Sequence, residues 1–176
     1  MSRDSSATTR NPGRAALRGS RIALLSMVAL FFSLVALGNM VDYGSNFAFV
    51  AHVLSMDDTF RSPTLMQRAI TAPWLHHGAY LFIIGWQLAT ASLCWWGLVR
   101  LWRARAAEAA DFDAAKGLAI CGLTAGVLLY GAGFLTVGGE WFAMWQSSQW
   151  NGQQSAHIFV MLTGLALLHM STAERA

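Results

Sequence analysis

Four long apolar stretches, separated by charged or turn-rich segments, constrain this chain more than any other feature. They cover about residues 22–41, 74–99, 117–138 and 154–172. Each is close to the roughly 20 residues that a helix rising 1.5 Å per residue needs to cross the core of a bilayer. Only 12% of the residues are charged, against about 25% in soluble domains. The sequence therefore predicts an all-α integral membrane protein, a four-helix transmembrane bundle whose first partner is the lipid bilayer.

The basic residues predict how the helices are oriented. Of the 12 Lys and Arg residues, only Arg61 and Arg68 fall in segments that four spans would place outside. Basic residues are enriched in the cytoplasmic segments of membrane proteins, so both termini are expected in the cytoplasm. The other basic residues are divided between the two tails and the second loop, which argues against nucleic-acid binding.

The segments outside the spans have distinct compositions. Residues 1–20 are rich in Ser, Thr, Arg and Gly and predict a disordered cytoplasmic tail, followed by a single four-span domain over residues 21–173. Residues 47–54 are apolar enough for a short helix in the first outer loop. The second outer loop predicts a Trp-rich segment at the membrane interface, where these rings are favoured. Its aromatic residues, which we expect to form an interaction surface, are Trp141, Phe142, Trp145 and Trp150.

Three glycines of the third span predict close helix packing. Gly122, Gly126 and Gly133 lie within about 40° of one another on a helical wheel. Small residues allow membrane helices to approach closely. We therefore expect a neighbouring helix along this stripe.

Polar residues gather in the predicted outer segments and at the outer ends of the spans. The candidates for an outer polar site are Asp42, Tyr43, Asn46, His52, Asp57, His76, His77, Glu140, Asn151 and His157. Ionisable residues at membrane depth are functional candidates, although most of these lie at helix ends where water reaches. Some are therefore expected only to cap or anchor helices, and whether the rest form one site is open.

A redox site is the most specific chemistry that these residues suggest. Imidazole is a common ligand of haem iron, and His76 or His77 would face His157 if the second and fourth helices were neighbours. Adjacent residues diverge by about 100°, so only one of the two histidines would point that way. No sequence resembles H-E-x-x-H, paired C-x-x-C or C-x-x-C-H. We therefore predict neither a metal nor a catalytic residue, with haem b or a quinone as the alternative.

Two long motifs occupy the predicted outer segments. They are DYGSNFAFVAHVLSMD at residues 42–57 and GGEWFAMWQS at residues 138–147, the second followed by WNGQ at residues 150–153. With these motifs the chain resembles, over about residues 22–168, a bacterial family of predicted small integral membrane proteins of unknown function. The resemblance implies four spans in a bacterial inner membrane and a functional surface formed by the outer segments.

The sequence favours a non-enzymatic function. Small size, elaborate outer segments and the absence of a catalytic motif predict an accessory or interaction subunit of a larger respiratory or transport complex, with a homo-oligomer as another possibility. The alternative is a redox membrane protein that binds haem, a metal or a quinone at its outer face, using His76 or His77, His157 and Glu140.

Overall fold

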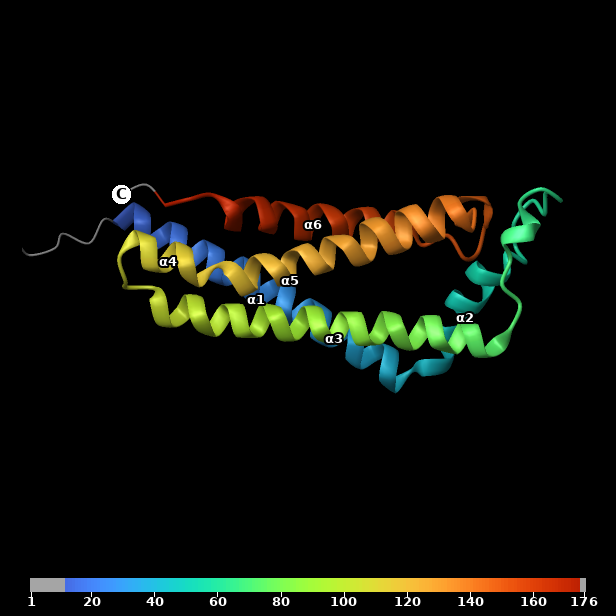
Figure 1. Cartoon of the computed structure of the whole chain (residues 1–176), viewed down its shortest axis with the longest axis horizontal. Coiled ribbons are helices and arrows are strands. Elements are labelled where there is room, and N and C mark those ends of the chain that lie inside the picture. Colours follow the sequence, from blue (N-terminus) through green and yellow to red (C-terminus); the bar gives the residue numbers. More distant parts are fainter. Residues whose placement is uncertain (1–11, 175–176) are drawn as a thin grey trace, which may run out of the picture.

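The computed structural model describes residues 12–174, which form helices and loops without any strand (Figure 1). The predicted all-α fold is therefore confirmed. The elements are α1 (Pro12–Val41), α2 (Tyr43–Ser55), η1 (Met66–Arg68), α3 (Pro73–Ala104), α4 (Ala109–Ala115), α5 (Gly117–Leu128), η2 (Leu129–Trp141), η3 (Met144–Gln146) and α6 (Gln153–Ser171).

Three helical stretches of the described chain are long and apolar enough to cross a membrane. They are α1, α3 and the continuous stretch Gly117–Trp141, which α5 and η2 form together. The 19-residue α6 packs against α5 and η2 but is not one of these three, since its first turns contain Gln153, Gln154, Ser155 and His157. A fourth span therefore remains a prediction.

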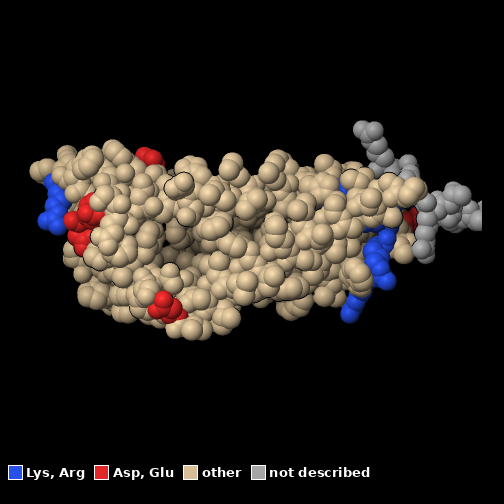
Figure 2. Space-filling model, turned by 180° about the vertical axis from the view of Figure 1, so that it is seen from behind, with Lys and Arg blue, Asp and Glu red and all other residues tan. Residues whose placement is uncertain are grey.

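Charged residues lie near the two ends of the elongated molecule, with an uncharged band between them (Figure 2). One end carries α2 and the loops that follow it, and the other carries the start of α1 and the end of α6 (Figure 1). We call them the cap end and the terminal end. This distribution is the one that a bilayer imposes, because charges are costly at membrane depth.

The prediction of a disordered tail over residues 1–20 is wrong for its second half. Helix α1 begins at Pro12, a favoured residue in the first turn of a helix. Its first turns continue through Ala15, Ala16 and Leu17, which favour helix, and carry Arg18 into buried contacts. The remainder of that predicted tail, residues 1–11, lies outside the described residues.

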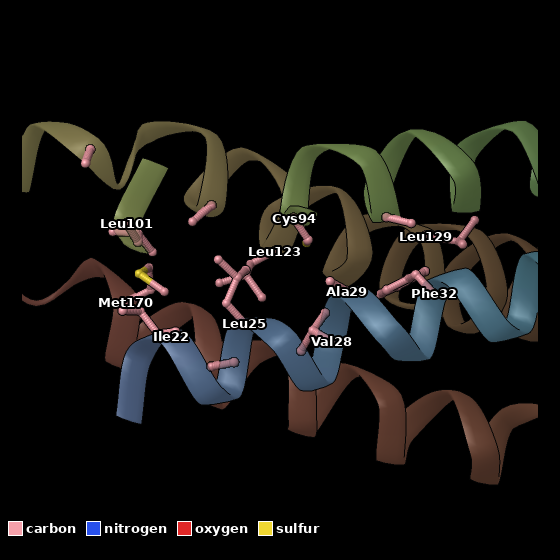
Figure 3. Packing of buried hydrophobic residues seen from close by; sticks show 14 of the residues in the cluster. Ile22, Leu25, Val28, Ala29, Phe32, Cys94, Leu101, Leu123, Leu129 and Met170 are labelled. Atoms are coloured by element: carbon pink, nitrogen blue, oxygen red, sulfur yellow. The ribbon is translucent and has the colours of Figure 1, made fainter. Parts of the chain in front are cut away.

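The hydrophobic core lies along the contacts of α1 with α3, of α3 with α5, and of α5 with α6. Leu25, Phe32, Cys94 and Leu123 are fully buried there. Figure 3 shows side chains from these helices meeting in the core, with Leu25 and Leu123 close to its centre.

Two of the three glycines in the predicted stripe lie at helix contacts. A Cβ atom on Gly122 would come within 2.7 Å of Cys94 Sγ, and one on Gly126 within 2.8 Å of the Phe32 ring. Gly133 does not pack against a helix, because a Cβ there meets only Leu129 of its own turn, at 4.0 Å. The sequence also did not indicate Gly97 of α3, whose Cβ would lie 2.6 Å from the backbone nitrogen of Ala119.

Gly133 leaves the stripe because the helix changes its winding. From Leu129 to Trp141 the chain is a π-helix of 13 residues, in which the N–H of residue i bonds the carbonyl of residue i−5. Phe142 N still follows this pattern, donating to Val137 O at 3.0 Å. More residues per turn rotate the later side chains away from the face that an α-helix would present. Most π-helices are single turns, so this length is unusual.

Charged side chains, all buried except that of Asp113, hold α6 at the terminal end. This terminal cluster consists of Arg18, Arg21, Asp113, Lys116 and Glu174. Arg18 Nη2 lies 2.6 Å from Glu174 Oε2, and both side chains are only 5% exposed. Arg21 Nη2 and Lys116 Nζ donate to the carbonyl of Thr172 at 2.9 and 2.8 Å. These cations stabilise the C-terminus of α6, whose last carbonyls have no partner within the helix.

Candidate functional site

The two predicted outer segments fold onto each other. We call residues 42–72 and 138–153 together the cap. Met56 from the first segment and Phe142 and Ala143 from the second are buried in one small apolar cluster. The first segment also closes on itself, because Ile70 N donates to Leu54 O at 2.8 Å. The cap is therefore a small packed layer with an apolar core of its own.

Asp58 joins the two segments through hydrogen bonds. Its Oδ2 accepts from the Ser147 hydroxyl at 2.5 Å and from Gln149 N at 3.3 Å. The hydroxyl of Ser147 in turn accepts from Trp150 N at 2.7 Å. The hydrogen bond from Ser147, followed by that from the Gln149 backbone, lowers the pKa of Asp58 below its ordinary value. Asp58 therefore acts as an ionised latch between the segments.

His52 lies between an acid and an aromatic ring. Its Nδ1 donates to Asp57 Oδ2 at 2.8 Å, and the two side chains are 38% and 40% exposed. The ring also stacks on Trp150, with centroids 4.4 Å apart and planes at 11°. Of the predicted polar candidates, His52 and Asp57 are thus brought together beside the Asp58 latch.

Cation–π and aromatic contacts reinforce the joint between the segments. Arg68 lies 4.6 Å above the Trp141 ring. Phe60 meets Trp145 edge to face at 5.9 Å, and Phe60 N donates to the Gln146 side chain at 3.0 Å. Trp141 and Trp145 of the second segment therefore help to bind the first segment, while about half of each side chain stays exposed. Phe142, in contrast, is buried.

A second polar group forms where α2 meets α3. Tyr43 OH and His77 Nδ1 are 2.8 Å apart, and the His77 ring stacks on Phe47 at 4.1 Å. Asn46 Nδ2 donates to the carbonyl of Asp42 at 3.4 Å, so these two residues interact within one turn. No hydrogen bond or ion pair connects this group to His52 and Asp57 in the described structure.

The other predicted site residues have separate surroundings. His76 Nε2 donates to the carbonyl of Ile70 at 2.7 Å, which ties the cap to α3. His157 Nδ1 donates to the carbonyl of Gln153 in its own helix at 2.7 Å. Asn151 accepts from Gln153 N at the start of α6, and Glu140 is exposed. Histidine pairing across α3 and α6, on which the haem hypothesis depends, is thus not seen.

The described residues include no group of three or more His, Cys, Asp or Glu that could hold a metal ion. His52, Asp57 and Asp58 of the cap instead pair with one another, with Ser147 or with backbone groups. This arrangement stabilises the surface that the two segments form.

An apolar pocket lies between α2, α3 and η2, beneath the cap, with a volume of about 320 Å³. The cap contributes Phe49 and Val53 from α2 and Phe142 and Met144 from its second segment. Ala79 and Phe82 come from α3, and Gly133 and Phe134 come from η2. Figure 2 shows a hollow in the uncharged surface near the cap end.

The sequence predicted neither this pocket nor the Asp58–Ser147 latch. Both depend on residues far apart in the chain. The sequence carries only weak indications of them. Asp58 directly follows the first motif and Ser147 ends the second, while the spacing of Gly133 predicted helix packing.

The match to known families covers most of the chain. Residues 17–172 match the family described as "Predicted small integral membrane protein", which has no established function. The chain belongs to this family. No curated protein and no solved structure matches it.

Membership confirms the resemblance that the two motifs indicated. Together with the apolar helices it shows that the chain is an integral membrane protein. Both cap segments lie within the part of the chain that this small integral membrane protein family covers.

Proposed function

We propose that this small integral membrane protein is a non-catalytic accessory or interaction subunit of a larger membrane complex, respiratory or transport, and that the cap is its docking surface. The observation that carries the proposal is the cap itself. Its two segments are latched into one layer by the hydrogen bonds that Asp58 accepts from Ser147, 89 residues further along the chain, and from Gln149.

Exposed aromatic side chains on this layer supply the means of binding. Phe60 is 73% exposed, Trp141 54% and Trp145 48%, although all three also contact the opposite segment. Aromatic residues are enriched in interface hot spots because they bury a large area at little entropic cost. We infer that the partner is another membrane protein with an apolar surface at the same membrane face.

The proposal places the protein in a bacterial inner membrane with four spans and both termini in the cytoplasm. The placement of Arg61 and Arg68 in the cap, with the other basic residues elsewhere, supports this orientation. The position of α6 beside α5 and η2 supports its inclusion as a fourth span.

The test is co-purification of the tagged protein from its own membranes in mild detergent, with quantitative mass spectrometry. We expect a stoichiometric membrane-protein partner, reduced about tenfold or more by the double variant Phe60→Ala/Trp145→Ala. The matched control is Trp96→Ala/Trp102→Ala, two exposed aromatic residues of α3 toward the terminal end. Recovery of the wild type only as a monomer or homo-oligomer would contradict the proposal.

A quinone-handling redox protein is the second candidate, and the Tyr43–His77 pair favours it. Val50 packs in one cluster with Tyr80, Tyr43 and Phe47 and also lines the apolar pocket, so a hydrogen-bonding pair and an apolar pocket adjoin. This candidate predicts that His77→Phe and Glu140→Gln impair quinone-linked electron flow without unfolding the protein. The haem and metal versions predict a Soret band or a stoichiometric metal in the purified protein.

A further inference from the structure

We propose that the apolar pocket between α2, α3 and η2 binds a hydrocarbon chain, supplied by a membrane phospholipid or by an isoprenoid. This is a binding function of the small integral membrane protein in its own right and does not depend on a docking partner.

The chemistry of the lining selects for hydrocarbon. None of the side chains around the pocket carries a charge, an N–H or an O–H group, and the surrounding residues are Phe, Val, Leu, Ile, Ala, Gly and Met. A water molecule is retained in a cavity only when it has polar partners. The volume of about 320 Å³ lies within the range of small-molecule pockets, roughly 300–1,000 Å³.

The depth of the pocket matches the acyl region of one leaflet. Ala79 and Ile83 follow the start of α3 at Pro73 by six and ten residues, which places them about 9–15 Å along the helix. Half of a bilayer core is about 15 Å thick. A chain can therefore enter sideways from the leaflet at the cap end, without leaving a hydrocarbon environment.

Two glycines of η2 leave the pocket open because they have no side chains to fill it. Gly133 and Gly138 both line it, and a Cβ on either glycine would meet no atom closer than 3.6 Å. Larger residues would therefore fit the backbone at both positions and would fill the space instead. Cap residues Phe142 and Met144 also line the pocket, so the folded cap helps to form its wall.

The experiment uses the full chain in phosphatidylcholine vesicles that contain a phosphatidylcholine with a diazirine at the end of one acyl chain. After irradiation, labelled residues are mapped by mass spectrometry. We expect labelling to concentrate on α2, α3 and η2 around the pocket. In Gly133→Phe this labelling should fall to the background seen on exposed residues of α6, such as Met161 and Leu165.

The matched control is Gly85→Phe. Gly85 is an exposed glycine of α3 with nothing within 4 Å of its Cβ position, and it does not line the pocket. This variant should label like the wild type. Thermal melting checks that Gly133→Phe is folded, and Gly138→Leu takes its place in the comparison if it is not.

Competition identifies the source of the chain. Displacement of the label by unlabelled phospholipid alone indicates an acyl chain, whereas displacement by a polyprenyl quinone at low molar ratio indicates an isoprenoid, and either supports the proposal. Equal labelling of pocket and α6 residues in the wild type would overturn it. Equal pocket labelling in the filled variant and the Gly85→Phe control would overturn it too.

Discussion

The two ends of this molecule use charged residues in opposite ways. At the terminal end, Arg18, Arg21 and Lys116 are buried and converge on Glu174 and on the carbonyl of Thr172. At the cap end, His52 and Asp57 form an exposed pair, and Asp58 latches a surface layer.

The two ends also differ in how tightly their helices pack. Toward the terminal end, Gly97 brings the backbones of α3 and α5 into direct contact, whereas an open apolar pocket lies beneath the cap. The terminal end is therefore a fixed clamp that fastens α1, α4 and α6 together. The cap end instead carries the exposed aromatic side chains and the exposed His52–Asp57 pair.

The largest effect is expected from Arg18→Met in the clamp. The substitution removes the ion pair with Glu174, the hydrogen bonds to the carbonyls of Arg105 and Ala107, and the contact with the Phe112 ring. Removing one partner of a buried pair costs about 3–5 kcal/mol. Thermal or denaturant unfolding in detergent measures the loss. The exposed Arg103 provides the control variant Arg103→Met, and equal stability of the two variants would refute the clamp.

A smaller loss of stability is expected when leucine replaces a glycine at a tight helix contact, and almost none when it replaces a glycine beside the pocket. Gly97→Leu should destabilise the bundle by about 1–3 kcal/mol, because the new side chain meets the Ala119 backbone. Gly133→Leu should leave stability unchanged within about 0.5 kcal/mol, because its side chain enters the pocket. Unfolding measurements compare them, and equal losses would show that the two regions are equally packed.

Asp58→Asn tests the cap alone. The amide keeps the shape of the side chain but lacks the charge that strengthens its hydrogen bonds with Ser147 and Gln149. Hydrogen exchange should rise in residues 56–61 and 146–150 and stay unchanged around Lys116. Asp57→Asn, which leaves the latch intact, is the matched control. A global rise in exchange would show that the cap is not an independent layer.

The smallest loss of stability is expected when acid protonates Asp58 in the cap and Asp113 at the terminal end. For Asp113, burial raises the pKa, but hydrogen bonds from Lys116 and the Glu174 backbone outweigh burial, and the net shift is downward. The pKa of Asp58 is lowered by its bonds to Ser147 and Gln149.

A carboxyl group whose pKa is lower in the folded than in the unfolded chain stabilises the fold at any pH above its unfolded pKa, here 3.8 for both residues. This contribution is lost as the pH falls through the folded pKa. The exchange rates at the cap and around Lys116, each divided by the rate of an unstructured peptide at the same pH, should therefore be insensitive to Asp58 and Asp113 between pH 7 and 5 and rise below about pH 4. In Asp58→Asn, the cap should no longer show this acid response. Persistence of the response in that variant would assign it to another group.

The sequence indicated the helices well because the requirement for apolar side chains at membrane depth is local and continuous along a span. Gly122 and Gly126 lie at contacts with neighbouring helices, as the sequence predicted, because the helix is regular there. Gly133 does not, because nothing in the local sequence pattern indicates a long π-helix. The length of the apolar stretch at residues 154–172 predicted a fourth span, but the polar residues in the first turns of α6 make that helix less apolar than the other three.

The candidate site was less predictable, because it depends on which distant segments meet. His52 and Asp57 lie five residues apart and their pairing is nearly local, whereas the Asp58–Ser147 bond joins two loops. Arg18 and Arg21 were interpreted only as markers of orientation. Their burial depends on the position of Glu174, which follows the last helix and which the sequence alone does not place beside them.

Photo-crosslinking in intact cells tests whether the cap docks on a partner: a photo-crosslinking amino acid replaces Phe60 of the cap and, in a separate strain, Trp96, toward the terminal end. If the cap is a docking surface, position 60 gives a discrete adduct with another membrane protein and position 96 gives none. Docking through the cap would be contradicted by the absence of a protein adduct at position 60, by an adduct only with a second copy of this chain, or by the same adduct from both positions.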